Sequence, residues 1–499
     1  MFDKIKRLGT ETAIYGISTV LGRFLNFLLV PFYTNVLQPG EYGTVTYVYS
    51  FIAFLNIVYG YGMESAYFKY SSTREIGTPG QHFSVPFISL GISSLVFSLF
   101  LGMSAPAIGD LAGLPNGSSS IVWYSAWILF FDALAIIPFA SLRMEGKAKA
   151  FAFIKFLNIA INVASNIVLL LVLRTGIEGI FISGVISSAA TFLILIPTIM
   201  RRFEFSLSRD LYRALLKFGL PYVPAGLATM IIQVVDRPVL RLLTDDAVLG
   251  VYQANYRLGI FMMLIVAMYD YAWRPFFLAH AADPHAKVLF ARVLTYLVLL
   301  MSILFLLLSF AIPEIVHIRI LGRYIIHPDY WSGLSIVPVV LLAYGFLGIY
   351  NNLIAGIYIE NKTSKLPAIT FAGAFVNVAA NFALIPVLGM MGAALATLLS
   401  YVVMAAVLYF IVQRVYPVRY EFGRLAKIAV ALLIVFGCSL IIGVGPYRIV
   451  WKTLLLVVFC GLIYWMKFLE PAELGEILGM FKTRGKAHQT TVTPTDMTP

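Results

Sequence analysis

The chain has 499 residues, of which 60% are hydrophobic and 12% are charged, and its formal net charge is +12. A soluble protein of this length would carry about twice that charged fraction, so composition excludes a soluble globular domain. The basic excess follows from membrane topology and affinity for anionic lipid headgroups, so nucleic-acid binding is not needed to explain it.

Apolar segments long enough to cross a bilayer recur along the whole chain. A membrane-spanning helix needs roughly 20 apolar residues, and only helices or closed barrels satisfy their backbone polar groups in lipid. Segment length favours helices, so the sequence predicts an all-α polytopic membrane protein with about fourteen transmembrane spans. In chain order the predicted spans are 10–36, 44–68, 83–109, 119–142, 149–173, 178–200, 213–243, 250–278, 287–315, 332–358, 366–388, 391–413, 423–444 and 447–467.

The basic residues predict which loops face the cytoplasm. Most of the 36 Lys and Arg fall in the N-terminal tail, in every second loop and in the C-terminal tail. Only six lie in the other loops: Arg174, Arg241, Arg319, Arg323, Arg448 and Lys452. Because short cytoplasmic loops are enriched in Lys and Arg, we expect a multi-pass protein of the bacterial inner membrane with both termini in the cytoplasm.

Two parts of the chain repeat each other. Asn162, Asn166, Gly176 and Gly179 match Asn377, Asn381, Gly389 and Gly392, and Gly43 and Tyr49 match Gly250 and Tyr256. We therefore predict two lobes related by an internal parallel repeat, an N-terminal lobe over 1–200 and a C-terminal lobe over 201–415. Two further spans follow over 416–470, with a polar cytoplasmic tail over 471–499. Such repeats are typical of secondary transporters, whose substrate lies between two moving lobes.

Several motifs carry a family resemblance in a fairly specific order. They are GRFLNFLLVPFYTNVLQPGEYG near the start, FGLPYVPAGL opening the seventh span, DRPVLRLL followed by LGVYQANYRL, and WRPFF ending the eighth span. The chain resembles the polysaccharide (Wzx-type) flippases of the multidrug, oligosaccharidyl-lipid and polysaccharide exporter (MOP) superfamily. The resemblance implies that the protein moves an undecaprenyl-pyrophosphate-linked oligosaccharide to the outer leaflet by alternating access, for O-antigen, capsule or exopolysaccharide assembly. The polymerase and other glycan-assembly proteins are then its expected partners.

Arginines inside the predicted spans are candidate headgroup ligands. Arg23 lies at the middle of the first span, and Arg257 lies in the outer third of the eighth. A charge at such depth is costly, so it normally faces a polar cavity or a partner, and a guanidinium matches the oxygens of a pyrophosphate. We expect Arg23 and Arg257 to bind the substrate pyrophosphate, with ion pairing or snorkelling to an interface as the alternative for each.

Other charged side chains in the spans have two open roles. Asp132 either binds a coupling H⁺ or Na⁺ ion or pairs with Arg23 or Lys155. Asp236 and Arg237 are adjacent, about 100° apart around a helix. We therefore expect Asp236 to pair with a neighbouring helix, for example with Arg257. That pairing leaves Arg237 and Arg241 to guide a phosphate or to close an outer gate.

Each of the competing functions predicts a different sequence feature. A drug/cation antiporter of the same superfamily is expected to have an acidic or apolar cavity, and a murein lipid flippase a basic residue in its second span. A membrane-embedded repeat-unit polymerase is expected to have a large outer loop. None of these features is evident, so we predict a transporter and not an enzyme. Cys438 and Cys460 fall inside the last two spans, and neither a metal nor a bound cofactor is expected.

Overall fold

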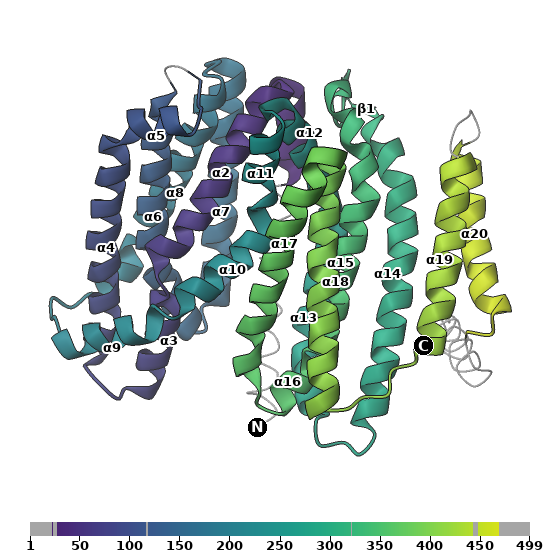
Figure 1. The fold of residues 1–499 in the computed structure, drawn as a ribbon. Coiled ribbons are helices and arrows are strands. Elements are labelled where there is room, and N and C mark those ends of the chain that lie inside the picture. Colours follow the sequence, from purple (N-terminus) through teal and green to yellow (C-terminus); the bar gives the residue numbers. More distant parts are fainter. Residues whose placement is uncertain (1–21, 23–26, 116–117, 321, 443–447, 469–499) are drawn as a thin grey trace, which may run out of the picture. The chain divides into compact units, whose positions relative to one another are not determined.

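The computed structural model describes residues 22, 27–115, 118–320, 322–442 and 448–468. These residues are almost entirely helical (Figure 1). They form two compact units, one within 1–287 and 311–418 and the other within 288–310 and 419–499. Residues predicted to form the polar tail, 471–499, lie outside the described part of the chain.

The first half of the chain contributes seven α-helices to the first unit. They are α2 (Pro39–Gly60), α3 (Met63–Thr73), α4 (Pro79–Met103), α5 (Ala105–Leu111), α6 (Ser119–Met144), α7 (Ala148–Ile167), which continues as the π-helix η1 (Val168–Val172), and α8 (Ile177–Arg202). A short apolar helix, Phe27–Val36, precedes them.

The second half begins with α9 (Arg209–Gly219), which contacts α3 and α4 and runs across their lower ends in Figure 1. It is followed by α10 (Tyr222–Val234), α11 (Asp236–Leu243), α12 (Asp246–Tyr256), the 3-10 helix η2 (Arg257–Gly259), α13 (Ile260–Ala279) and α14 (Ala286–Val316). The remaining elements of this half are β1 (Arg319–Ile320), β2 (Arg323–Tyr324), η3 (Pro328–Ile336), α15 (Val337–Leu353), α16 (Ala355–Ile359), η4 (Thr363–Lys365), α17 (Leu366–Leu388) and α18 (Met390–Val415). Strands β1 and β2 are antiparallel, with Arg319 opposite Tyr324.

The second unit contains α19 (Phe422–Ile442), α20 (Arg448–Trp465) and the middle of α14. Within it, Phe305 of α14 packs edge-on against Phe436 of α19, with ring centroids 5.1 Å apart. Cys438 and Cys460 lie on α19 and α20 as free thiols.

Thirteen described segments are long and apolar enough to cross a membrane, and each coincides with one of the thirteen predicted spans after the first. Large apolar side chains such as Phe100 and Leu193 are exposed, whereas Asn166, Asn377 and Asn381 are fully buried. This distribution suits a protein whose outer surface contacts lipid and whose polar groups face inward. The all-helical, multi-pass fold class is therefore confirmed.

Two glycines bring α2 and α12 into backbone contact. A Cβ atom on Gly43 would lie 1.8 Å from the carbonyl oxygen of Asp246, and one on Gly250 would lie 1.9 Å from that of Pro39. Only a residue without a side chain fits at either position. The contact is reciprocal, as the predicted repeat would require, although the repeat itself stays a prediction.

The two matched asparagine pairs make the same hydrogen bonds. Asn166 donates to the carbonyl and side-chain oxygens of Asn162 at 2.8 and 3.2 Å. Asn381 donates to the same two atoms of Asn377 at 2.9 and 3.0 Å. The sequence match between α7 and α17 thus extends to local geometry.

Candidate functional site

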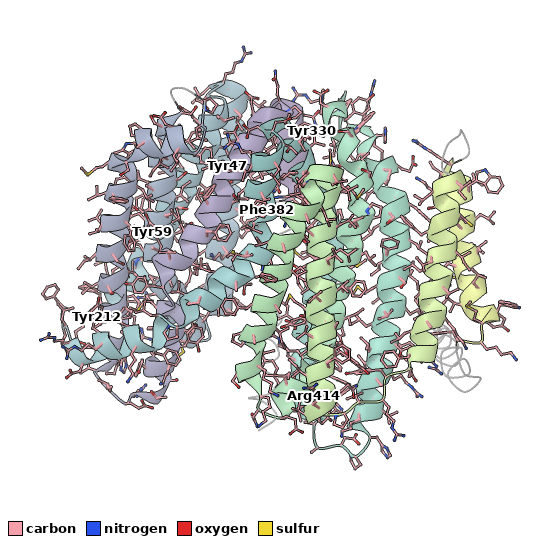
Figure 2. The ribbon with its side chains drawn as sticks, viewed as in Figure 1. Tyr47, Tyr59, Tyr212, Tyr330, Phe382 and Arg414 are labelled. Atoms are coloured by element: carbon pink, nitrogen blue, oxygen red, sulfur yellow. The ribbon has the colours of Figure 1, made fainter. Side chains whose placement is uncertain are left out.

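Three arginines of the second half, Arg237, Arg241 and Arg257, have different surroundings. Figure 2 shows the two ends of the first unit: Tyr47 and Tyr330 lie in the upper part of the view, and Tyr212 and Arg414 in the lower part. Because Arg414 belongs to a loop predicted to be cytoplasmic, the upper end is the predicted outer side.

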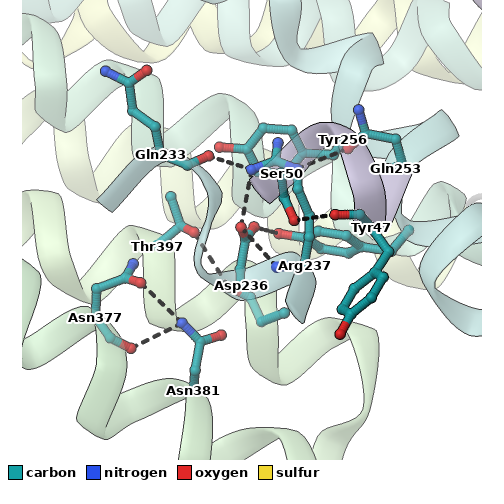
Figure 3. A network of polar contacts seen from close by, with 12 residues as sticks. Tyr47, Ser50, Gln233, Asp236, Arg237, Gln253, Tyr256, Asn377, Asn381 and Thr397 are labelled. Carbon is teal, nitrogen blue, oxygen red and sulfur yellow. Dashed lines mark hydrogen bonds and ion pairs between the residues drawn. The ribbon is translucent and has the colours of Figure 1, made fainter. Parts of the chain in front are cut away.

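Arg237 is buried and fully engaged within its own half of the chain (Figure 3). Its Nε donates to the side-chain oxygen of Gln253 at 3.0 Å, and its Nη1 donates to the carbonyl of Gln233. The guanidinium lies over the ring of Tyr256, 5.0 Å from its centroid. Since Nε and Nη1 are hydrogen-bonded and its charge is balanced by Asp236, Arg237 has the surroundings of a structural residue.

Asp236 supplies the charge that balances Arg237. Its Oδ1 lies 3.0 Å from Arg237 Nη1 and also accepts the backbone N–H of Arg237, while its Oδ2 accepts the hydroxyl of Tyr252 at 2.5 Å. The structure therefore pairs Asp236 with its neighbour in sequence and not with Arg257. The long side chain of Arg237 folds back along the start of α11. Its guanidinium therefore reaches Asp236, although adjacent residues point in different directions around a helix.

Asn377, Asn381 and Thr397 lie near Asp236 in Figure 3. The Nδ2 atom of Asn377 and the Oδ1 atom of Asn381 are buried and have no hydrogen-bond partner among the described residues. The sequence pattern marks these asparagines as part of the repeat, and polar side chains within an apolar helix are the signal of a further role.

Arg241 reaches from α11 to the first half of the chain. Its Nη1 donates to the carbonyl of Ala112 at 2.6 Å and its Nη2 to that of Gly113 at 2.8 Å. The guanidinium also lies 3.9 Å from the ring centroid of Tyr47 on α2. No sequence pattern could reveal these contacts, because two of the partners are backbone carbonyls in a distant turn.

Arg257 occupies η2, the 3-10 segment that joins α12 to α13, and is half-buried. Among the described residues it forms no hydrogen bond and no ion pair. Its charge interacts electrostatically with the hydroxyl groups of Tyr33, Tyr42 and Tyr49, which all come from the first half of the chain. Arg257 thus has three tyrosines within electrostatic range, and its donors form no hydrogen bond with a described residue. Arg23, the other arginine predicted to bind the headgroup, lies outside the described residues.

Asp132 lies on α6 and accepts a hydrogen bond from the hydroxyl of Ser188 on α8 at 2.7 Å. Lys155 of α7 interacts electrostatically with Asp132, and its Nζ lies 4.3 Å from the ring centroid of Phe139. The structure thus brings Asp132 and Lys155 into one neighbourhood, without an ion-pair contact between them among the described residues.

A chain of hydrogen bonds runs from Tyr33 to Ser187, next in sequence to the serine that contacts Asp132. Tyr33 donates to Asn166 Oδ1 at 3.0 Å, Asn166 donates to Asn162, and Asn162 donates to Ser187 Oγ at 3.2 Å. Ser187 is adjacent in sequence to Ser188, the partner of Asp132. Polar side chains therefore continue across the interior of the first half.

Known proteins are similar to this chain in sequence and in fold. Residues 8–280 match the family model described as polysaccharide biosynthesis protein. The Lsg locus putative protein 1 of Haemophilus influenzae is 23% identical over 76% of this chain and 96% of its own length.

Among solved structures, the lipid II flippase MurJ in an inward closed conformation matches with a TM-score of 0.71 and 17% identity, over 91% of this chain and 99% of that one. A multidrug resistance MATE transporter of the MOP superfamily, in an inward-facing conformation, matches with a TM-score of 0.59 and 15% identity, over 79% and 94%. The fold is therefore one that transporters and flippases adopt, in agreement with the prediction that the chain is not an enzyme. Since the family model covers more than half of the sequence, the chain belongs to the polysaccharide biosynthesis protein family of multi-pass membrane proteins, with the fold of the MOP superfamily.

Proposed function

We propose that the chain moves an undecaprenyl-pyrophosphate-linked oligosaccharide from the cytoplasmic to the outer leaflet of the bacterial inner membrane. Family membership supports a role in polysaccharide assembly, and the shared fold supports transport by two lobes that open alternately to either side. The pyrophosphate is the constant part of such a substrate, so the protein needs an anion site inside the membrane.

The surroundings of Arg257 carry this proposal. A guanidinium inside a membrane protein is normally paired with an anion or a set of carbonyls, yet Arg257 forms no hydrogen bond or ion pair with any described residue. Tyr33, Tyr42 and Tyr49 lie within electrostatic range of Arg257, and the hydroxyl groups of Tyr42 and Tyr49 are the proposed additional donors. Arginine binds phosphate oxygens in pairs, and tyrosine hydroxyls donate to the remaining ones.

A headgroup bound at Arg257 would contact both halves of the chain. Arg257 comes from the second half and the three tyrosines from the first. An anion held between them would make contacts with both predicted lobes, so its arrival and departure would change the free energy of bringing the lobes together. Substrate binding is in this way linked to alternating access.

We assign proton coupling to Asp132. Asp236 is already balanced by Arg237 and hydrogen-bonded by Tyr252, whereas Asp132 accepts one hydroxyl donor from Ser188 and forms no ion pair with a described residue. A carboxyl group in such surroundings can take up and release a proton during a transport cycle. The polar chain from Tyr33 to Ser187 ends one residue before Ser188, the hydrogen-bond donor to this carboxyl group.

The test is translocation by the purified full-length chain in vesicles that contain an undecaprenyl-pyrophosphate-linked oligosaccharide. Glycan exposed on the far side would be removed with an added glycosidase. Arg257→Gln should abolish translocation, and Arg174→Gln, which removes an exposed arginine from an outer loop, should translocate like the wild type. Unchanged translocation by Arg257→Gln would contradict the assigned site.

A murein lipid flippase is the second candidate, because the lipid II flippase MurJ shares the fold over 91% of this chain. The same vesicles distinguish the two activities when lipid II replaces the oligosaccharide substrate. Translocation of lipid II alone would overturn the proposed substrate class, and accumulation of a hydrophobic cation without either lipid would identify a drug/cation antiporter.

A further inference from the structure

The guanidinium of Arg241 has two edges. One edge contacts the first half of the chain, and the other contacts the second half. One edge, formed by Nη1 and Nη2, holds the adjacent carbonyl oxygens of Ala112 and Gly113 at 2.6 and 2.8 Å. These carbonyls belong to the turn that joins α5 to α6, in the first half. Separation of the halves would remove both acceptors at once.

The other edge is held within the second half. Arg241 Nε lies 2.7 Å from Oδ1 of Asp246, and Nη2 donates to Oδ2 at 3.1 Å. Asp246 is the first residue of α12, whose N-terminus is capped by the Asp245 side chain bound to the backbone N–H of Val248. This ion pair does not depend on the first half, so it would keep the guanidinium oriented after the halves separate.

We propose that the edge of Arg241 now bound to Ala112 and Gly113 is an exit site for the substrate pyrophosphate. The phosphate replaces the two carbonyls, and this exchange opens the outer side of the protein. The proposal rests on the proposed function and adds a second phosphate contact, after Arg257, together with a trigger for opening.

The geometry of the present contact suits a phosphate. Two neighbouring oxygens that accept from the Nη1 and Nη2 donors occupy the positions of two oxygens on one phosphate group. A hydrogen bond between two charged groups is stronger than one from a guanidinium to a neutral carbonyl, so a phosphate competes effectively for the same donors. In the present state the ring of Tyr47 on α2, 3.9 Å from the guanidinium, also supports its plane.

Asp246 gives the exit site the weak affinity that release requires. Its carboxylate offsets the charge of Arg241, whereas Arg257 has no ion-pair partner among the described residues. A phosphate would therefore bind more tightly at Arg257 than at Arg241. Binding that weakens toward the outer side favours departure of the headgroup.

Other contacts across the same region cannot make this exchange. Tyr330 donates to the carbonyl of Leu37 at 3.0 Å, and Asn35 donates to that of Tyr324 at 2.8 Å. Both donors are neutral and would be solvated when the halves part. Among these three contacts between the halves, only that of Arg241 offers a charged donor to an anion.

The experiment measures the separation of the halves by spin labels in the full-length chain, reconstituted in vesicles. The labels replace Leu111 and Leu242, whose side chains are 91% and 72% exposed, after Cys438 and Cys460 are changed to Ser. Inorganic pyrophosphate on the predicted outer side is the probe. In the wild type it should shift the population from short to long distances, and Arg174→Gln should behave in the same way.

Two variants at the site should differ from each other in their response to pyrophosphate. Arg241→Gln should show long distances without pyrophosphate and no further shift. Asp246→Asn should respond at a several-fold lower pyrophosphate concentration, because the carboxylate no longer offsets the guanidinium. A wild type that translocates glycolipid but shows no shift with pyrophosphate would overturn the exit site and leave the proposed function standing. An Arg241→Gln variant that shows short distances without pyrophosphate and still shifts to long distances with it would also overturn the exit site. That result, too, would leave the proposed function standing. A pyrophosphate shift in a protein that moves no glycolipid would instead contradict the proposed function.

Discussion

Gly43 of α2 and Gly250 of α12 each contact the backbone of the other helix, so that neither position has room for a Cβ atom. Together with the contacts of Arg241, Tyr330 and Asn35, this pairing joins the two halves of the chain at the predicted outer side. In the proposed transport cycle, the outer ends of α2 and α12 part when the headgroup leaves.

Gly43→Ala should therefore weaken the closed state. The new methyl group would meet the Asp246 carbonyl, and overpacking of this kind costs about 1–3 kcal/mol. The label pair at 111 and 242 should report more open protein. Gly40→Ala is the matched control, since nothing lies within 4 Å of a Cβ there, and this change should stabilise α2 by up to about 1 kcal/mol. Equal behaviour of both variants would contradict a close-packed outer contact.

The pair formed by Asp236 and Arg237 should matter for folding. Removal of one partner from a buried ion pair costs about 3–5 kcal/mol, so Arg237→Gln should lower the thermal unfolding temperature strongly. Asp236→Asn combined with Arg237→Gln should recover part of the loss. The exposed pair of Arg274 and Asp270 is the comparison, because Arg274→Gln should cost at most about 1 kcal/mol. If Arg237→Gln is as stable as wild type but fails to translocate, Arg237 has a transport role and not a structural one.

Glu145, in the turn between α6 and α7, should make stability depend on acid pH. Burial would raise its pKa, but hydrogen bonds from Lys147 and Ser141 and the charge of Arg202 outweigh burial and lower it. A lowered pKa in the folded state means that the ionised carboxylate stabilises the fold above the ordinary glutamate range. This stabilisation disappears as the pH falls through the lowered pKa. The melting temperature of wild type should therefore exceed that of Glu145→Gln at neutral pH, with a difference that shrinks in acid. A difference in melting temperature that stays constant as the pH falls through the lowered pKa of Glu145 would rule out this linkage.

Asp132 and Asp236 should respond differently to neutralisation. Asp132→Asn should yield folded protein whose translocation no longer follows an imposed pH gradient, because the proton-binding carboxyl group is gone. Asp236→Asn should instead reduce the amount of folded protein. Translocation rates measured in vesicles with proton or sodium gradients separate the two ions. A sodium requirement that is lost in Asp236→Asn and kept in Asp132→Asn would refute proton coupling at Asp132.

The membrane spans could be predicted from the sequence because an apolar run of bilayer length is a local property. Thirteen spans lie where the sequence predicts them. The first predicted span, 10–36, lies largely outside the described residues. The partners of Arg237, Arg241 and Arg257 could not be predicted in this way. The three residues look alike in an apolar helix, and their surroundings depend on Gln253, on two backbone carbonyls and on tyrosines from the other half of the chain.

In the proposed function, the protein recognises the lipid that it moves by its pyrophosphate. The most direct test compares initial rates of translocation, in vesicles containing wild-type protein, for one oligosaccharide carried either on undecaprenyl pyrophosphate or on undecaprenol. We predict rapid movement of the pyrophosphate-linked form and background movement of the uncharged form. Equal rates for the two lipids would contradict the claim.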